Sequence, residues 1–414
     1  MKIDCDLAAL PLPTGVHARY VDTGTGLRQH YLEAGGPDAR ADGDVIQEGP
    51  SPTVLLLHGF PELAYSWRKV MPALAAAGYR VIAPDQRGYG RTTGWTVGYD
   101  VDLAEFGMPQ LVRDAAALLA ALGVDHVDAV IGHDFGSPVA AWCGLIRPDI
   151  FRAVVCMSAP FAGPPDWPGS EPEPDIHEAL RQLDPPRRHY QWYYGDREAN
   201  DHMMNAPGGL DVFLRAYFHC KSGDRLENEP YRLEGWTAEA LAELPRYYVM
   251  DADRTMAETA ASMSPTSRMA AKCQWLTEDE LAVFTAEYGR TGFQGGLNWY
   301  RRQTSPEGAA EARLFAGRKI DAPSCFMGGQ ADWGVFQMPG ALEAMEKTAT
   351  SRYLGTVLVE GAGHWVQQEA PDAVSASLLA FLDSVKDARD GKRRARDAVS
   401  SLGASFGALR RQSA

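Results

Sequence analysis

The sequence has few cysteines, and none of them is arranged to hold a metal ion or to staple a small fold. The six cysteines lie far apart, none forms a CxxC pair, and no cysteine–histidine cluster has the spacing of a zinc site. We therefore expect free thiols in a reducing compartment and no metal centre.

Long apolar runs and an excess of positive charge are also missing. No stretch approaches the ~18 consecutive apolar residues of a membrane span, and residues 1–12 lack the basic patch and apolar run of a signal peptide. Lysine and arginine number 40 against 54 aspartates and glutamates, which gives a formal net charge of −14. Nucleic acids and anionic membrane surfaces bind basic faces, so neither is expected as a partner, and the cytoplasm is the expected location.

The first part of the chain has the pattern of a parallel sheet covered by helices. Hydrophobic residues make up 45% of the 414 positions, enough for a packed core. Short continuous apolar runs alternate with helical patterns, as strands buried on both faces do. We expect strands at 54–57, 79–84, 126–132 and 151–157, and helices at about 67–77, 108–122 and 135–146. Before them, residues 17–20 and 28–32 predict an antiparallel hairpin, and 36–50 a surface loop.

The pattern changes at Phe161. From there to about Phe315 the sequence is aromatic, helical and punctuated by proline, and Thr277 with Glu280 predicts a capping box that opens a helix through about Tyr288. Alternation then resumes, with strands expected at 322–328 and 356–360 and helices at 340–347 and 370–385. We therefore expect a mostly parallel, doubly wound α/β core (1–160 and 317–385), a helical cap over its ligand-binding edge (161–316), and a basic, solvated tail (386–414).

The segment GHDFG, residues 132–136, lies where an apolar strand meets a helix. Small residues two before and two after a nucleophile allow the sharp turn that lifts its side chain above the sheet. Aspartate is also a common N-cap, so Asp134 alone has two interpretations. However, Asp332 and His364 each follow a later strand, in the chain order of the α/β-hydrolase triad. We expect Asp134 to be the nucleophile, His364 the base and Asp332 the acid that orients it.

Two backbone amides are expected to form an oxyanion hole beside Asp134. The loop HGFPE at 58–62 ends a strand and can supply the amide of Phe60, and the residue after the nucleophile, Phe135, supplies the second. An apolar pocket is expected around these motifs. Its candidate lining residues are His58, Pro61, Trp67, Gln191, Trp192, Trp299, Trp333 and Trp365.

Together these motifs resemble the soluble epoxide hydrolases of the α/β-hydrolase superfamily, over nearly the whole chain. The matching stretches are HGFPE (58–62), DQRGYG (85–90), GHDFG (132–136), GGLNWYR (295–301) and GHW (363–365). In that family two cap tyrosines point at the substrate oxygen. The resemblance implies that these are Tyr300 and Tyr190, with Tyr193 and Tyr194 as neighbouring alternatives to Tyr190. The chain departs from the family at 36–50, in a longer cap between about 226 and 273, and in its tail, which leaves substrate size and oligomeric state open.

The resemblance also implies a reaction, the hydrolysis of a small, lipophilic epoxide to a vicinal diol without metal or organic cofactor. Asp134 would attack an epoxide carbon and form an ester, while the tyrosines, protonated at neutral pH, donate to the departing oxygen. His364, oriented by Asp332, would then activate the water that hydrolyses the ester, and the amides of Phe60 and Phe135 would hold the oxyanion.

Other functions are less well supported by the same residues. A haloalkane or haloacid dehalogenase also uses an aspartate nucleophile, but typically has a tryptophan after it to hold the halide. Here Phe135 follows Asp134, and neither it nor Phe60 carries a side-chain hydrogen-bond donor. An esterase is disfavoured because Ser137 lies outside the turn. A non-catalytic ligand-binding module is a third interpretation, but it would not require His364 with Asp332. A homo-oligomer remains open.

Overall fold

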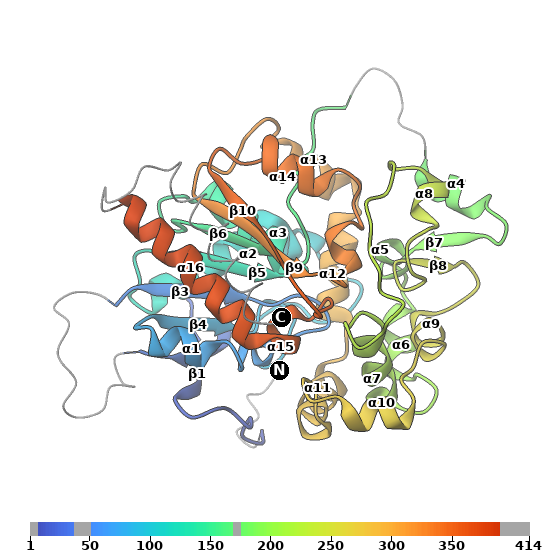
Figure 1. The fold of residues 1–414 in the computed structure, drawn as a ribbon, viewed down its shortest axis with the longest axis horizontal. Coiled ribbons are helices and arrows are strands. Elements are labelled where there is room, and N and C mark those ends of the chain that lie inside the picture. The colour runs from blue at the N-terminus through green and yellow to red at the C-terminus, as the bar shows by residue number, and fades with distance from the viewer. Residues whose placement is uncertain (1–6, 37–50, 169–174, 390–414) are drawn as a thin grey trace, which may run out of the picture.

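The centre of the molecule is one mixed sheet. The computed structural model describes residues 7–36, 51–168 and 175–389 (Figure 1). Within these ranges the sheet has eight strands in the spatial order β1-β2-β4-β3-β5-β6-β9-β10. β2 runs antiparallel to β1 and β4, and the other neighbours are parallel. The bounds are β1 (Val16–Asp22), β2 (Arg28–Ala34), β3 (Thr53–Leu57), β4 (Arg80–Pro84), β5 (Ala129–His133), β6 (Val154–Met157), β9 (Ser324–Gly329) and β10 (Tyr353–Val359).

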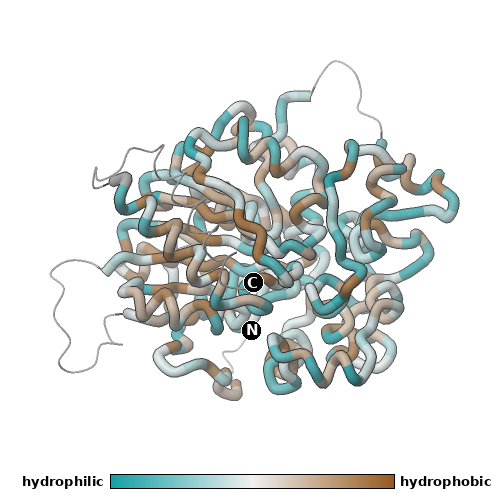
Figure 2. The backbone as a smooth tube through the Cα atoms, in the orientation of Figure 1, coloured by the Kyte–Doolittle hydropathy of each residue, from teal (hydrophilic) through white to brown (hydrophobic). Residues whose placement is uncertain are grey.

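The central strands are buried because both faces of the sheet are covered. Along β3, Leu55 and Leu57 pack into the core on one face, and Val54 and Leu56 into the core on the other. The first face is covered by α2 (Met108–Ala121), α3 (Gly136–Ile146) and α14 (Ala341–Lys347), the second by α1 (Met71–Ala76), α15 (Val366–Glu369) and α16 (Pro371–Arg389). Figure 2 shows hydrophobic residues gathered along these strands. Strands buried on both faces lose the period-two pattern, as the sequence indicated.

A helical region is inserted between β6 and β9, and Figure 1 shows it beside the sheet. It contains α4 (Ile176–Arg181), α5 (Tyr190–Tyr193), α6 (Ala199–Met204), α7 (Leu210–Cys220), α8 (Ala238–Leu241), α9 (Met256–Ala261), α10 (Ser267–Lys272), α11 (Glu278–Thr291), α12 (Gln294–Gln303) and α13 (Pro306–Arg313). The predicted capping box of Thr277 and Glu280 opens α11. The region also holds a short antiparallel pair, β7 (Arg187–His189) and β8 (Val249–Asp251). We call this region the cap.

The mostly parallel α/β sheet with a helical insertion confirms the predicted fold class, while several boundaries differ. The helix expected at 67–77 is a 3₁₀ turn, η2 (Ala64–Trp67), followed by α1, which has a proline in its first turn and therefore a defined start. Strands β5 and β6 begin later than expected, because Val127 and Phe151 meet only in an isolated bridge. Helix α16 continues to Arg389, four residues into the expected tail. Residues 37–50 of the expected loop and 390–414 of the tail lie outside the described ranges.

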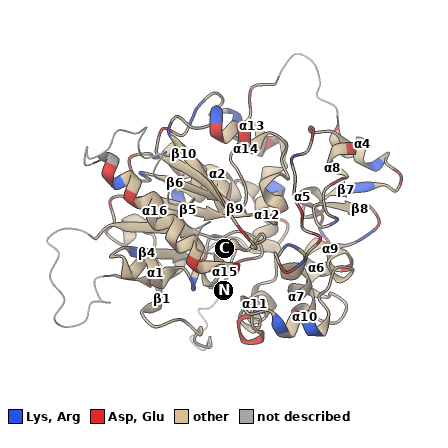
Figure 3. Ribbon diagram, viewed as in Figure 1, with Lys and Arg blue, Asp and Glu red and all other residues tan. Residues whose placement is uncertain are grey.

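Charged residues are spread over the molecule, and the cysteines are unpaired. Figure 3 shows lysine, arginine, aspartate and glutamate scattered over helices and loops, with both signs mixed. Each of the five cysteines in the described part of the chain is free, and four of them are buried. Among the same residues, no helix combines the length and the apolar character needed to cross a bilayer.

Candidate active site

Asp134 lies on a strained turn between β5 and α3. Its φ of +51° is a left-handed conformation that non-glycine residues rarely adopt. The turn depends on two glycines, because a Cβ at Gly132 would overlap the carbonyl of Gly136, and a Cβ at Gly136 would overlap the backbone of Leu57. The N-cap of α3 is Phe135, without a side-chain cap. The alternative role of Asp134 as an N-cap is therefore wrong, and its carboxylate stands free of the helix at the edge of the sheet.

The structure brings Asp134, Asp332 and His364 together in one buried cluster. The Nε2 atom of His364 lies 3.1 Å from Oδ2 of Asp134, and Nδ1 lies 3.0 Å from Oδ1 of Asp332. Asp332 follows β9 at the start of η4 (Trp333–Val335), and His364 follows β10. His364 and Asp332 are almost completely buried, whereas Asp134 keeps 6% of its surface accessible. A small reactant can therefore approach Asp134, with the imidazole held behind it.

Mutual charge sets the protonation of this cluster at rest. Burial raises the pKa of Asp134, but the hydrogen bond and charge of His364, together with the charge of Lys221, lower it below its usual range. Burial lowers the pKa of His364, and Lys221 lowers it further, but Asp332 and the hydrogen bonds to both carboxylates raise it to about 9. At neutral pH the pair is thus a carboxylate and an imidazolium. Loss of the negative charge of Asp134 would remove one of the interactions that raise the pKa of His364 and would favour its neutral form.

One of the two expected oxyanion-hole amides already contacts the carboxylate. The N–H of Phe60 donates to Oδ1 of Asp134 over 2.9 Å. The N–H of Phe135 directly follows Asp134 at the start of α3 and makes no hydrogen bond to its carboxylate in the structure. Each carboxylate oxygen therefore has one donor, Phe60 for Oδ1 and His364 for Oδ2.

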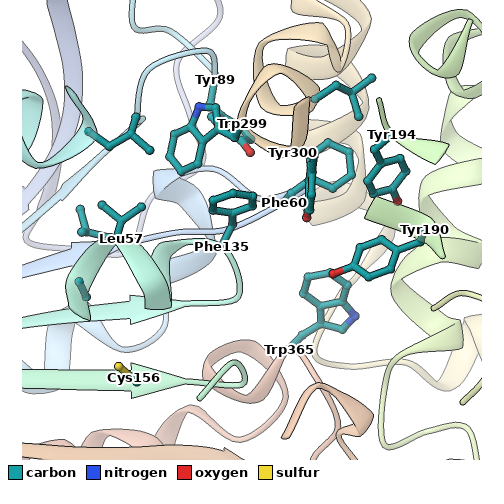
Figure 4. Close-up of a cluster of buried hydrophobic side chains, with 14 of the residues drawn as sticks. Leu57, Phe60, Tyr89, Phe135, Cys156, Tyr190, Tyr194, Trp299, Tyr300 and Trp365 are labelled. Carbon is teal, nitrogen blue, oxygen red and sulfur yellow. The ribbon is translucent and has the colours of Figure 1, made fainter. Parts of the chain in front are cut away.

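Two tyrosine hydroxyls from the cap converge near the same carboxylate. Figure 4 shows the hydroxyls of Tyr190, on α5, and Tyr300, on α12, pointing into one space beside Phe135 and Trp365. We call this the reaction space. The Tyr300 ring packs edge-on against Phe135, with 4.9 Å between centroids. The Tyr190 hydroxyl donates to Oε1 of Gln337 over 3.2 Å. Burial, followed by the charge of Asp134, raises the pKa of both phenols far above 10, so both remain protonated donors.

The neighbouring tyrosines use their hydroxyls elsewhere in the cap. The hydroxyl of Tyr193 bonds the ring of His202, and that of Tyr194 donates to Tyr217 over 2.9 Å. The side-chain amide of Gln191 donates to the Tyr190 hydroxyl over 3.2 Å, which fixes that hydroxyl beside the reaction space. These contacts favour Tyr190 over its two neighbours.

The structure assigns the expected pocket residues to different places. Trp299 packs edge-on against Phe135, and Trp365 lies 4.7 Å from the His364 ring, so both border the reaction space. Trp333 packs against Tyr231.

Three of the pocket assignments are corrected by the structure. Trp67 lies in the core on the opposite face of the sheet, because η2 turns its side chain under β3. Trp192 packs against His177 and points away from Tyr190, since residues two apart on a helical turn do not share a face. The ring of His58 is hydrogen-bonded to Gly59 and to the amide of Gln86, so it supports the loop that carries Phe60. Pro61 is buried directly after that residue.

Glu62 joins the loops that carry Phe60, Asp134 and His364, a role that the sequence motif HGFPE did not reveal. Its carboxylate accepts from the Gly59 amide over 3.1 Å and pairs with His133 at 2.6 Å, and it also accepts from Gln367 on α15. The other ring nitrogen of His133 lies 2.7 Å from the carbonyl of His364. Glu62 is completely buried, so it links these three loops from behind and is not exposed to a reactant.

Replacing Glu62 by Leu should therefore destabilise the fold. Removing one partner of a buried charge pair costs about 3–5 kcal/mol, because the other partner stays buried and unpaired. Burial raises the pKa of Glu62, but His133 and the Gly59 amide lower it overall, so its contribution is present at neutral pH and disappears as the pH falls. Urea unfolding of Glu62→Leu, with Glu62→Gln as the size-matched control, measures the effect. Equal midpoints for the Leu variant and the natural chain would contradict it.

The cap and the loop that carries His364 are joined by hydrogen bonds at the C-terminal end of α7 and just after it. The indole N–H of Trp365 donates to the carbonyl of Phe218 over 2.7 Å, and the backbone N–H of His364 donates to the carbonyl of Lys221 over 2.9 Å. The carboxylate of Glu369 accepts from Gly223 in the cap and from the amides on either side of His364. The position of the imidazole is thus fixed partly by the cap.

Comparisons with known proteins agree with the resemblance noted in the sequence. Residues 52–200 match the family described as alpha/beta hydrolase fold. The chain is 33% identical to Epoxide hydrolase A of Mycobacterium tuberculosis over 389 residues, 89% of this chain and 98% of that protein. It is 32% identical to Epoxide hydrolase B of the same organism over 380 residues, 84% of this chain and 95% of that protein. The solved structure of an epoxide hydrolase from an endophytic Streptomyces matches with a TM-score of 0.70 at 31% identity, covering 91% of this chain and 97% of that one.

Proposed function

The chain belongs to the epoxide hydrolases of the α/β-hydrolase fold, and from this premise we propose that it converts a lipophilic epoxide to a vicinal diol through an ester on Asp134. The observation that carries the proposal is the position of His364. Its ring is hydrogen-bonded to Asp134 on one side and to Asp332 on the other, and the charge of Asp134 in turn reaches the phenols of Tyr190 and Tyr300. A nucleophile, a base and acid donors therefore surround one small volume.

The first step is attack on an epoxide carbon by a carboxylate oxygen of Asp134. A new carbon–oxygen bond forms, the ring carbon–oxygen bond breaks, and the departing oxygen takes a proton from Tyr190 or Tyr300. Each hydroxyl would stabilise the developing alkoxide by roughly 3 kcal/mol, as donors placed at a developing oxyanion do. Tyr300 makes no hydrogen bond through its hydroxyl within the described residues, so that hydroxyl is available to the substrate.

The second step is hydrolysis of the ester. His364 removes a proton from water, and the resulting hydroxide attacks the carbonyl carbon of the Asp134 ester. The amide of Phe60 donates to the tetrahedral oxyanion, and the amide of Phe135 is the second candidate donor. The bond between that carbon and the alkyl oxygen then breaks, so the diol leaves with one oxygen from the epoxide and one from the original Asp134 side chain.

A dehalogenase remains the second candidate in chemical terms, but the site favours the epoxide. A departing halide needs donors beside the nucleophile, and the side chains there are Phe60 and Phe135, which have none. The donors present are phenols, whose protons an alkoxide requires and a halide does not.

A single turnover in heavy-oxygen water tests the covalent mechanism. The first diol should contain only light oxygen, and the label should appear in the peptide that contains Asp134, as mass spectrometry of both can measure. Under multiple turnover the label should then reach the diol, which serves as the internal control. Heavy oxygen in the first diol, with none in the protein, would instead make Asp134 a base that activates water.

A further inference from the structure

Lys221 is a buried cation in the cap, directly after α7. It keeps only 2% of its surface accessible. Its ammonium makes no ion pair and no hydrogen bond with any other residue that the structure describes. Lysine is almost never fully buried without a partner, so this position requires an explanation beyond packing.

Aromatic rings surround the ammonium and take the place of a partner. Nζ lies 4.7 Å from the ring of Tyr248 and 5.2 Å from that of Tyr217. The rings of Tyr190, Tyr247 and Trp365 lie at 5.6, 5.7 and 6.0 Å. Ring faces attract a cation without neutralising it. A carboxylate partner would cancel the positive charge, whereas this cage leaves its field intact.

The caged charge faces the reaction space. Two of its rings, Tyr190 and Trp365, border that space (Figure 4), and the carbonyl of Lys221 holds the backbone of His364. Burial lowers the pKa of Lys221, while the charge of Asp134 is the largest influence that raises it. Lys221 in turn lowers the pKa of both Asp134 and His364. Nucleophile and base therefore both experience this cation.

Ester formation changes the charge balance around His364. At rest, the anions of Asp134 and Asp332 offset the cations of His364 and Lys221. When Asp134 becomes a neutral ester, one anion is lost, together with the charged hydrogen bond that held the proton on Nε2. The two cations, His364 and Lys221, are then balanced by a single anion, Asp332. Because like charges in a buried site disfavour each other, the protonated form of His364 becomes less favourable.

We propose that Lys221 is a positioning residue for the second half-reaction, whose unpaired charge drives the proton off His364 once Asp134 is an ester. The inference rests on the proposed function. The proton that leaves Nε2 replaces, through water, the one that a tyrosine gave to the epoxide oxygen, so no other proton donor or acceptor is needed. In this way the base becomes available only when the ester is present to be hydrolysed.

Other titratable groups also surround His364 and enter the design of the test. Asp134 and Asp332 bond its ring, while His133 (with Glu62) and Glu369 contact its loop. Tyr190 and Tyr300 interact with it through the charge of Asp134. Burial raises the pKa of Glu369 to about 7, although three backbone amides oppose the shift. Its titration would appear equally in every Lys221 variant. The diagnostic quantity is therefore the difference between variants, not the shape of one pH profile.

The test compares Lys221→Met, which keeps the length of the side chain, with Lys221→Arg, which keeps its charge. Ester formation and ester breakdown are measured separately with styrene oxide, by mass spectrometry of quenched single turnovers between about pH 5 and 10. In Lys221→Met, the pH at which ester breakdown reaches half of its maximal rate (the midpoint) should rise by about one pH unit or more. Breakdown near neutral pH should therefore slow about tenfold and recover at high pH. Ester formation should stay within about threefold, because His364 and Phe60 still hold Asp134 ionised. The Arg variant should restore the midpoint.

Several outcomes would overturn the inference. If both steps slow together with an unchanged midpoint, Lys221 has only a structural role. If the loss is a higher KM confined to epoxides that carry a carboxylate, Lys221 binds substrate anions instead. Lys221→Gln, a second neutral variant, supports the inference if it shifts the midpoint as Met does and opposes it if it does not. Failure to detect any ester in the natural chain or in a His364 variant would refute the proposed function itself and is thus distinguishable.

Discussion

Replacement of His364 by Gln is expected to leave the enzyme trapped as its Asp134 ester. Attack by the carboxylate precedes the step that needs a base, so the variant should still open the epoxide but fail to hydrolyse the ester. Steady turnover should fall by roughly 10³-fold or more. Intact-protein mass spectrometry should show one added substrate mass, and peptide mapping should locate it on Asp134.

The Gln side chain is suited to this test because it can still donate to Asp134 but cannot accept a proton from water. The matched control is Asp134→Ala in the same His364→Gln background, which should acquire no mass. An adduct on any other residue, or a folded His364→Gln chain that turns over normally, would contradict the assignment of base and nucleophile.

Removal of both cap hydroxyls should nearly abolish ring opening. Tyr190→Phe and Tyr300→Phe each delete one donor to the departing oxygen, and loss of such a donor slows a reaction by roughly 10²–10³-fold. The rate of ester formation in single turnovers measures this effect, because the hydroxyls act before hydrolysis. The fold should be retained because both rings remain, and with them the contacts of Tyr300 with Phe135 and Phe60 and those of Tyr190 with Tyr194 and Tyr248.

Tyr193 and Tyr194 provide matched controls for the same deletion. Their hydroxyls bond His202 and Tyr217 inside the cap, so Phe at either position should leave ester formation close to the natural rate. If the Tyr190 and Tyr300 double variant opened epoxides normally, the acid donors would have to be reassigned, with Tyr194 tested first because its ring packs 5.0 Å from that of Tyr300.

The central arrangement of the site was predictable because parallel strands end at one edge of a sheet. Asp134, Asp332 and His364 each follow a strand, so adjacent strand positions β5, β6, β9 and β10 bring them close together however distant they are in sequence. The capping box at Thr277 was predictable for a different reason, since its two hydrogen bonds join residues three apart.

Features that depend on how the cap packs were not predictable in this way. Lys221 looks like an ordinary basic residue at a helix end, where it would interact with the helix dipole; only the tertiary structure surrounds it with rings. Trp67 and Trp192 were placed near the site because they are close to motifs in sequence, but a side chain's direction depends on its turn of helix. The strands β7 and β8, with three residues each, are too short to show a period.

The segment after α7 is hydrogen-bonded to residues 361–369, the histidine loop. These bonds affect how caps can be exchanged between related enzymes. The cap is an insertion, and exchanging it between relatives is an obvious way to make chimeras with new selectivity. Here, however, a graft cut at the ends of the insertion would separate Gly223 from Glu369 and the carbonyl of Lys221 from His364. The imported cap would then meet a histidine loop with which it had not evolved. The exchangeable unit is therefore discontinuous, the cap together with residues 361–369, and chimeras designed around that unit keep the base in place.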